Sequence, residues 1–278
     1  MNRITVLMEN TVRRRGLVAE HGLSLWVECE DGPILFDAGQ TAAWRQNAER
    51  LGIDVSAARA VVLSHGHYDH GGGIPEFPFG QRGVPLYVHP KAFLPRYARS
   101  APDRPATVPI GLEWRVEQIE AKGGHIVMNE GTTGIGRQAY VLADIPRVTP
   151  YEPAPWEFES EGADGLRRPD RIDDEQLLVL DLPDGLAVIL GCSHPGLVNC
   201  LLRVMDAFPG RRIAALIGGT HLEKADGDRL RETASFLDGI DIPILAPLHC
   251  TGARTQCGLF HALGERVRWY GTGDRLDL

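Results

Sequence analysis

The ten residues from 64 to 73 concentrate side chains that bind metal ions. Their sequence, Ser-His-Gly-His-Tyr-Asp-His-Gly-Gly-Gly, places His65, His67, Asp69 and His70 within six residues. Neutral imidazole and carboxylate are the donors that suit Zn, Fe or Mn. A single histidine in a polar loop is more often solvated, but four donors at this spacing favour a metal site.

An apolar run over residues 60–63 precedes this loop and predicts a buried parallel strand. At the end of that strand, His65 and His67 point the same way, while Asp69 and His70 lie one turn further on. Each pair can hold one of two neighbouring ions. We therefore predict one or two divalent ions, with Zn as the first expectation and Fe or Mn as alternatives.

Further histidines follow three apolar runs near the other end of the chain. Residues 187–190 lead to His194, residues 213–217 to His221, and residues 242–248 to His249. The intervals between these histidines, 27 and 28 residues, fit one strand–helix–strand unit each, and Asp37 precedes His65 by 28 residues as well. Ligands in open α/β sheets gather outside the carboxyl ends of the strands. We therefore expect all these side chains at one edge of the molecule.

The elements that must position these donors follow from apolar runs and turn residues. We expect strands at residues 4–8, 23–30 and 34–36, a helix at 41–51, and helices at 196–208 and 228–237 between the three late strands.

Composition limits the class of protein. With 278 residues and 43% apolar content, the chain is long enough for a large core, and we predict a single domain over 1–278. The formal charge of −8 argues against nucleic-acid binding but permits a phosphorylated small molecule. No apolar run approaches a membrane span, and the first residues are too strand-like for a signal peptide. Five cysteines without a C-x-x-C pair predict reduced thiols in the cytoplasm. The oligomeric state stays open.

The middle of the chain differs from the rest in amino-acid composition. Of the 19 prolines, 13 lie between Pro75 and Pro169, so we expect an insert or lid at about 75–175. Short strands are expected at 86–88, 112–119, 125–128 and 138–142, and a long loop at 149–175. Trp114, Tyr140, Tyr151 and Trp156 would come near the metal-binding edge, where Tyr151 and Trp156 could contact a flat, cyclic substrate. Trp114 fits the core of the insert better.

The H-x-H-x-D-H pattern resembles the signature of the metallo-β-lactamase superfamily. Asp37 matches the supporting acidic motif of that family, and His194 and His249 match its later ligands. The resemblance implies an α/β fold, a metallo-β-lactamase-like four-layer αβ/βα sandwich with two mixed β-sheets. One position departs from the pattern, because His221 stands where the superfamily commonly has an aspartate that bridges two metals. An imidazole coordinates through one nitrogen and cannot bridge.

The resemblance also suggests roles for individual residues. His65, His67 and His194 would bind a first ion, and Asp69, His70 and His249 a second, with His221 adjacent. Asp37 would fix a ligand histidine through a hydrogen bond. The strings at 20–24, 191–196 and 249–252 resemble a subgroup that includes the dihydropterin-forming (ribofuranosylaminobenzene 5'-phosphate) synthase of methanopterin biosynthesis. His21 lies in the first string and is a candidate substrate contact.

Three functions remain open on this basis. The leading one is a metal-dependent hydrolase that directs a metal-bound hydroxide at a small ester or phosphoester, because bound zinc lowers the pKa of water to about 7. Asp69 would orient that hydroxide and carry a proton. The first alternative is a transferase that joins a dihydropterin to an aromatic amine phosphate with loss of pyrophosphate. The second is a metal-stabilised sensor or binding protein without turnover.

Overall fold

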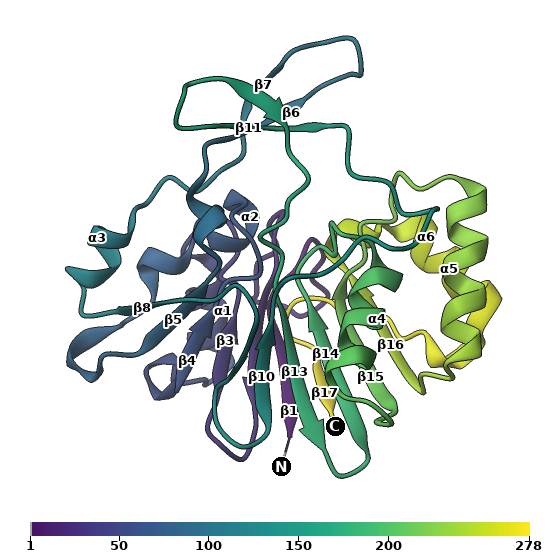
Figure 1. Ribbon diagram of the computed structural model, residues 1–278. Coiled ribbons are helices and arrows are strands. Elements are labelled where there is room, and N and C mark those ends of the chain that lie inside the picture. The colour runs from purple at the N-terminus through teal and green to yellow at the C-terminus, as the bar shows by residue number, and fades with distance from the viewer. Residues whose placement is uncertain (1) are drawn as a thin grey trace.

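A computed structural model describes residues 2–278 of the chain. Two β-sheets face each other, with α1 and α3 on the outer side of one and α4, α5 and α6 on the outer side of the other (Figure 1). The first sheet has the order β17 (Arg275–Asp277), β1 (Arg3–Met8), β2 (Ser24–Glu28), β3 (Ile34–Phe36), β4 (Ala60–Val62), β5 (Pro85–Val88), β8 (His125–Met128). The second has the order β16 (Ile244–Leu248), β15 (Ile213–Gly219), β14 (Gly185–Leu190), β13 (Leu177–Leu182), β10 (Ala139–Leu142), β9 (Thr132–Gly134).

The helices are short to medium in length. They are α1 (Ala43–Arg50), α2 (Tyr68–Gly71), α3 (Val116–Glu120), α4 (Leu197–Ala207), α5 (Gly227–Gly239) and α6 (Ala253–Leu263). Single 3-10 turns lie at Val55–Ala57, Ile74–Glu76, Gly80–Arg82, Pro90–Phe93, His249–Thr251 and Gly264–Arg266. The helices expected at 41–51, 196–208 and 228–237 correspond to α1, α4 and α5 within two residues at each end.

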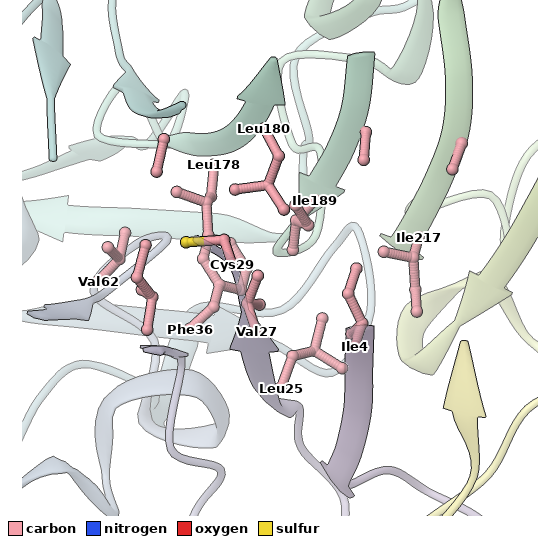
Figure 2. Packing of buried hydrophobic residues seen from close by; sticks show 14 of the residues in the cluster. Ile4, Leu25, Val27, Cys29, Phe36, Val62, Leu178, Leu180, Ile189 and Ile217 are labelled. Carbon is pink, nitrogen blue, oxygen red and sulfur yellow. The ribbon is translucent and has the colours of Figure 1, made fainter. Parts of the chain in front are cut away.

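Three apolar clusters separate four layers. The middle cluster fills the space between the sheets, where Leu25 and Phe36 of the first sheet lie opposite Leu178 and Ile189 of the second (Figure 2). A second cluster lies between the first sheet and α1 and α3, and a third lies between the second sheet and α4, α5 and α6. The four-layer sandwich expected from the resemblance is therefore confirmed.

The strands that lead to the predicted metal donors are parallel neighbours. In the first sheet β3, β4 and β5 run parallel, and Phe36 pairs with Val62. In the second sheet β14, β15 and β16 run parallel, and Leu190 pairs with Gly218. Because both sets end at the same edge of the sandwich, the loops after them meet there.

The segment between β5 and β13 carries a third sheet that the sequence interpretation missed. Its strand order is β12 (Arg167–Pro169), β11 (Phe158–Glu161), β6 (Arg96–Arg99), β7 (Ala106–Pro109). This sheet, called the cover sheet below, stands over the end of the sandwich opposite the two termini (Figure 1). The expected loop at 149–175 thus contains two strands. Both strands are short, their side chains are mostly polar and none is buried, so the sequence shows no apolar alternation there.

The prediction of a strand at residues 112–119 was wrong. Residues 116–120 form α3, and the side chain of Gln118 accepts a hydrogen bond from the backbone N–H of Arg115, which starts the helix. Trp114 is buried in the cluster beneath the first sheet, and Tyr140 packs on Phe208 of the opposite layer. Neither ring is among the residues that line the cavity described below.

Two sequence-based expectations concern features of the whole chain. None of the helices within residues 2–278 is long and apolar enough to cross a membrane. All five cysteines lie in this range and all are free thiols.

Candidate metal centre

Sharp backbone turns at the strand ends aim the donor side chains. Asp37, Ser193, His221 and His249 have φ angles of 56°, 61°, 49° and 50°, in the left-handed region that residues other than glycine rarely adopt. Each lies one to three residues beyond a strand of the two parallel sets. Such strained residues gather at functional sites because surrounding contacts hold them there.

Three imidazoles form the first donor group, His65, His67 and His194. His65 Nε2 lies 3.0 Å from His67 Nδ1 and 3.2 Å from His194 Nε2. Burial lowers the pKa of all three rings, to about 3 for His67, so they are neutral at physiological pH. His67 Nε2 and His194 Nδ1 are buried and have no hydrogen-bond partner within residues 2–278.

The second donor group consists of Asp69, His70 and His249. His249 Nε2 lies 3.2 Å from His70 Nε2 and 3.3 Å from Asp69 Oδ2, which is 4.0 Å from His70 Nε2. His21 extends this group, because its Nε2 lies 3.1 Å from the same Asp69 oxygen while its side chain remains 57% exposed. Burial alone would raise the pKa of Asp69, but His70 and the hydrogen bonds from His21 and His249 hold it well below its usual value.

Asp37 connects the first sheet to this group. Its Oδ2 lies 2.6 Å from His70 Nδ1, and it accepts hydrogen bonds from the backbone N–H and the hydroxyl of Ser64 at 2.7 and 2.8 Å. Burial alone would lower the pKa of His70, but the carboxylates of Asp37 and Asp69 raise it to about 9. The ring therefore carries a proton at neutral pH unless a cation takes that place.

His221 lies beside the first group, with its ring centroid 4.4 Å from that of His194. Two nearby thiols, Cys192 and Cys250, lie among the donors. Cys192 Sγ is 3.1 Å from His70 Nε2, and donor atoms of Cys192, His221 and Cys250 all lie within 4.8 Å of one another.

Glu175 was missed as part of the site. Its buried carboxylate accepts hydrogen bonds from the backbone N–H groups of Cys192, Ser193 and His194 at 3.0 to 3.2 Å and lies 3.8 Å from His65 Nδ1. Burial raises its pKa to about 7. The only hint in the sequence is its place just before the buried strand β13, where a charge needs partners.

Two further polar residues hold His249. The backbone N–H of His249 donates to Glu9 Oε1 at 2.8 Å, and its Nδ1 lies 3.0 Å from Asn10 Oδ1. Both partners directly follow β1, so their place at a strand end was the available signal.

The glycines of the donor loop are required by close contacts. A Cβ on Gly66 would lie 2.0 Å from the carbonyl oxygen of Ala92, and one on Gly73 would lie 2.1 Å from that of Ala38. Trp114 Nε1 donates to the carbonyl of Gly71 at 2.7 Å. The loop is thus fixed against three neighbouring segments.

Behind Gly66 lies a buried ion-pair cluster. The backbone N–H of Gly66 donates to Asp174 Oδ2 at 2.8 Å, and Arg96 binds both Asp174 and Asp170 at 2.6 to 2.9 Å. Asp173 pairs with the exposed Lys91, but Asp174 is fully buried.

A cavity of about 400 Å³ opens above the donors. The donors that line it are His67, Asp69, His194, His221 and His249, together with His21. Its other walls come mostly from the segment before β11 and from the start of α5, with Tyr151, Trp156, Phe158, Lys224 and Arg229. Tyr151 and Trp156 therefore line the same cavity as the donors, and their contact with a substrate stays a prediction.

The residues present fit a divalent cation. Neutral buried imidazoles, together with ionised carboxylates, are the donors that such ions prefer, and ring nitrogens 3.0 to 3.2 Å apart converge as ligands do. All seven predicted donors and Asp37 are brought to one place. Which of them bind metal stays a prediction.

Comparison with known proteins agrees with this geometry. The chain is 28% identical over 258 residues to 7,8-dihydropterin-6-methyl-4-(beta-D-ribofuranosyl)-aminobenzene-5'-phosphate synthase of Methanocaldococcus jannaschii, covering 86% of this chain and 83% of the relative. It is 30% identical over 250 residues to an uncharacterized protein of the same organism, covering 90% of each.

Among solved structures, a metal-dependent hydrolase of the β-lactamase superfamily matches with a TM-score of 0.85 and 30% identity, over 100% of this chain and 99% of that one. A diphosphatase from the PhnP family has the same fold, with a TM-score of 0.57 and 15% identity over 100% and 98% of the two chains. The model of the metallo-β-lactamase superfamily matches residues 18–205. This chain therefore belongs to the metallo-β-lactamase superfamily.

Proposed function

We propose that the protein is a metal-dependent hydrolase of a small anionic ester, in particular a phosphoester. The observation that carries this proposal is the convergence of two donor groups beside one cavity, which His67, His194, Asp69 and His249 line. His65, His67 and His194 would hold one ion, and Asp69, His70 and His249 a second. The whole chain would act as one domain, with the insert at about 75–175 forming the cover of the cavity.

A bound metal would supply a Lewis acid and an activated water near neutral pH. Zn fits the imidazole-rich donors best, and Fe or Mn remain alternatives. Asp69 orients the attacking water, because its carboxylate is ionised and accepts hydrogen bonds. His21 bonds to the same carboxylate at 3.1 Å and reaches solvent, so this pair offers a path by which a proton leaves the site.

An anionic substrate is supported by the cations of the cavity wall. The Nε of Arg229 is buried and lacks a hydrogen-bond partner within residues 2–278, although the residue faces the cavity. Lys224 lies on the same side, 3.5 Å from Glu157. A phosphate or carboxylate would satisfy Arg229, because guanidinium pairs with both in a planar, two-bond geometry.

Trp156 favours a substrate with a flat ring. Its side chain is half exposed at the cavity wall, where a large apolar side chain is otherwise unfavourable. Tyr151 lies on the same segment. Aromatic walls above a few convergent polar groups are typical of sites for cyclic small molecules.

A transferase is the second candidate, favoured by the similarity to the archaeal synthase over most of both chains. In that reaction a dihydropterin would be joined to an aromatic amine phosphate with loss of pyrophosphate. The aromatic wall and Arg229 would suit such substrates as well.

The test is to compare both activities before and after removal of metal. Chelation should abolish cleavage of bis(p-nitrophenyl) phosphate, and added Zn should restore it. Incubation with a dihydropterin pyrophosphate and an aromatic amine phosphate, followed by mass spectrometry, distinguishes the two reactions. Metal-dependent cleavage without coupled product supports the hydrolase, coupled product with pyrophosphate release supports the transferase, and neither reaction with metal bound contradicts both.

A further inference from the structure

Cys192, His221 and Cys250 follow three adjacent parallel strands, β14, β15 and β16. Their donor atoms lie within 4.8 Å of one another. The backbone N–H of His221 is 3.2 Å from Cys250 Sγ, and Cys250 Sγ is 3.6 Å from the carbonyl oxygen of Cys192. The cluster is therefore a compact arrangement of two sulfurs and one ring nitrogen.

These thiols differ from the cysteines that fill the core. Cys29 and Cys200 belong to the apolar clusters between the layers. Cys192 and Cys250 lie outside those clusters, face the cavity and contact histidines and backbone polar groups. Packing of apolar side chains therefore explains the first pair but not the second.

The backbone is shaped to admit Cys250. A Cβ on Gly219 would lie 2.6 Å from Cys250 Sγ and 2.4 Å from the carbonyl oxygen of Gly191. Any larger residue at this position would displace the sulfur of Cys250 or the backbone of Gly191. The observed position of Cys250 thus depends on a glycine at the end of β15.

We propose that Cys192, His221 and Cys250 form a separate binding position for a thiophilic divalent ion such as zinc. Two thiolates and an imidazole make up three corners of a tetrahedral zinc site. Soft sulfur donors select zinc and its heavier analogue cadmium over manganese or magnesium. This position goes beyond the proposed function, since it does not depend on the reaction catalysed.

The new position lies next to the second donor group. His70 Nε2 lies 3.1 Å from Cys192 Sγ and 3.2 Å from His249 Nε2, so His70 stands between the two sets. His70 can therefore complete either set of ligands. His221, which cannot bridge two ions, gains a role here that needs only one nitrogen.

The first test is cobalt titration of the reduced, metal-free full chain. A thiolate–cobalt complex gives an intense near-ultraviolet charge-transfer band, which imidazole and carboxylate ligands do not give. The wild type should show this band, and Cys192→Ser and Cys250→Ser should each lose most of it. Cys257→Ser is the matched control and should keep it, because Cys257 is exposed on α6. A wild-type complex with only the visible bands of nitrogen and oxygen ligands overturns the proposal.

A second measurement needs no variant. Iodoacetamide labelling read by mass spectrometry should show that cadmium slows alkylation of Cys250 at least tenfold, while that of Cys257 is unchanged. Equal labelling of Cys250 with and without bound cadmium contradicts the proposal. Because neither readout uses turnover, both outcomes are independent of whether the protein is a hydrolase.

Discussion

The first donor group contains three neutral imidazoles, whereas the second contains Asp69 and lies against a second carboxylate, Asp37. The first is compact, with the two measured nitrogen pairs 3.0 and 3.2 Å apart. In the second, donor atoms are 3.2 to 4.0 Å apart, and the partly exposed His21 reaches its carboxylate.

The difference concerns charge as well as spacing. Burial keeps the rings of the first group neutral, but the carboxylates around His70 raise its pKa to about 9. A cation bound by the second group would replace the proton on His70, whereas a cation bound by the first group would find its imidazoles already neutral. We therefore expect the first group to anchor an ion firmly and the second to respond to its surroundings.

The largest expected effect comes from removing the first group. The double variant His65→Ala/His67→Ala should lose one metal equivalent and have no detectable turnover, because two of three imidazoles are gone. Elemental analysis and the phosphodiester assay check this. His261→Ala, an exposed histidine on α6, is the control. Full metal content and activity in the double variant would rule out this group as a metal site.

Asp69→Asn should separate chemistry from binding. The amide still offers an oxygen but cannot carry a proton, so kcat should fall by about 10²- to 10⁴-fold with a smaller loss of metal. Kinetics and metal content are measured on the same preparation. A parallel loss of both would leave Asp69 as a ligand only.

Asp37→Asn removes the negative charge beside His70 and so tests how that charge affects metal binding by the second group alone. It should weaken metal binding there by about 10- to 100-fold, as loss of a residue that orients a ligand histidine typically does. Binding to the first group should be unchanged. Calorimetric titration resolves the two affinities, and equal weakening of both would contradict the separation of the groups.

Asp174→Asn probes the support beneath the first group. Burial alone would raise the pKa of Asp174, but Arg96 lowers it below its usual value. A lowered pKa gives stability that is present above about pH 4, the unfolded value, and is lost as the pH falls through the folded one. The variant should be less stable by about 3 kcal/mol at pH 7 and should lose less stability than the wild type below pH 4. Urea unfolding across pH is the measurement, and parallel pH curves would contradict the assignment.

The smallest expected effect lies at the cavity wall. Tyr151→Ala/Trp156→Ala should raise KM by about tenfold for a cyclic substrate, since a lost aromatic contact accounts for about 1 kcal/mol. Metal content and kcat should change little. Unchanged kinetics would show that this segment does not contact substrate.

Long regular patterns were predictable from the sequence, and so were the donors attached to them. The 28-residue step from Asp37 to His65 and the steps of 27 and 28 residues from His194 to His221 to His249 follow from strand–helix–strand units, which local periodicity reveals. The confirmed sandwich depends on the same pattern.

The insert and the supporting residues were not predictable in this way. The cover sheet has strands of three or four residues without apolar alternation, and α3 depends on a side-chain cap rather than on periodicity. Glu175 and Asp174 act through contacts with residues far along the chain, which no local pattern encodes. Cys192 and Cys250 come together only because three strands are adjacent.

The hydrogen bond from Gly66 to Asp174 spans 108 residues of chain, and the contact of His70 with His249 spans 179. Closing loops of this length costs conformational entropy before the stabilising contacts at their ends can form. We therefore expect such contacts to form late in folding. During synthesis the donor loop leaves the ribosome long before Asp174 and His249 do. Metal uptake is then expected to wait for nearly the whole chain, so that a nascent protein cannot trap an ion in an incomplete site.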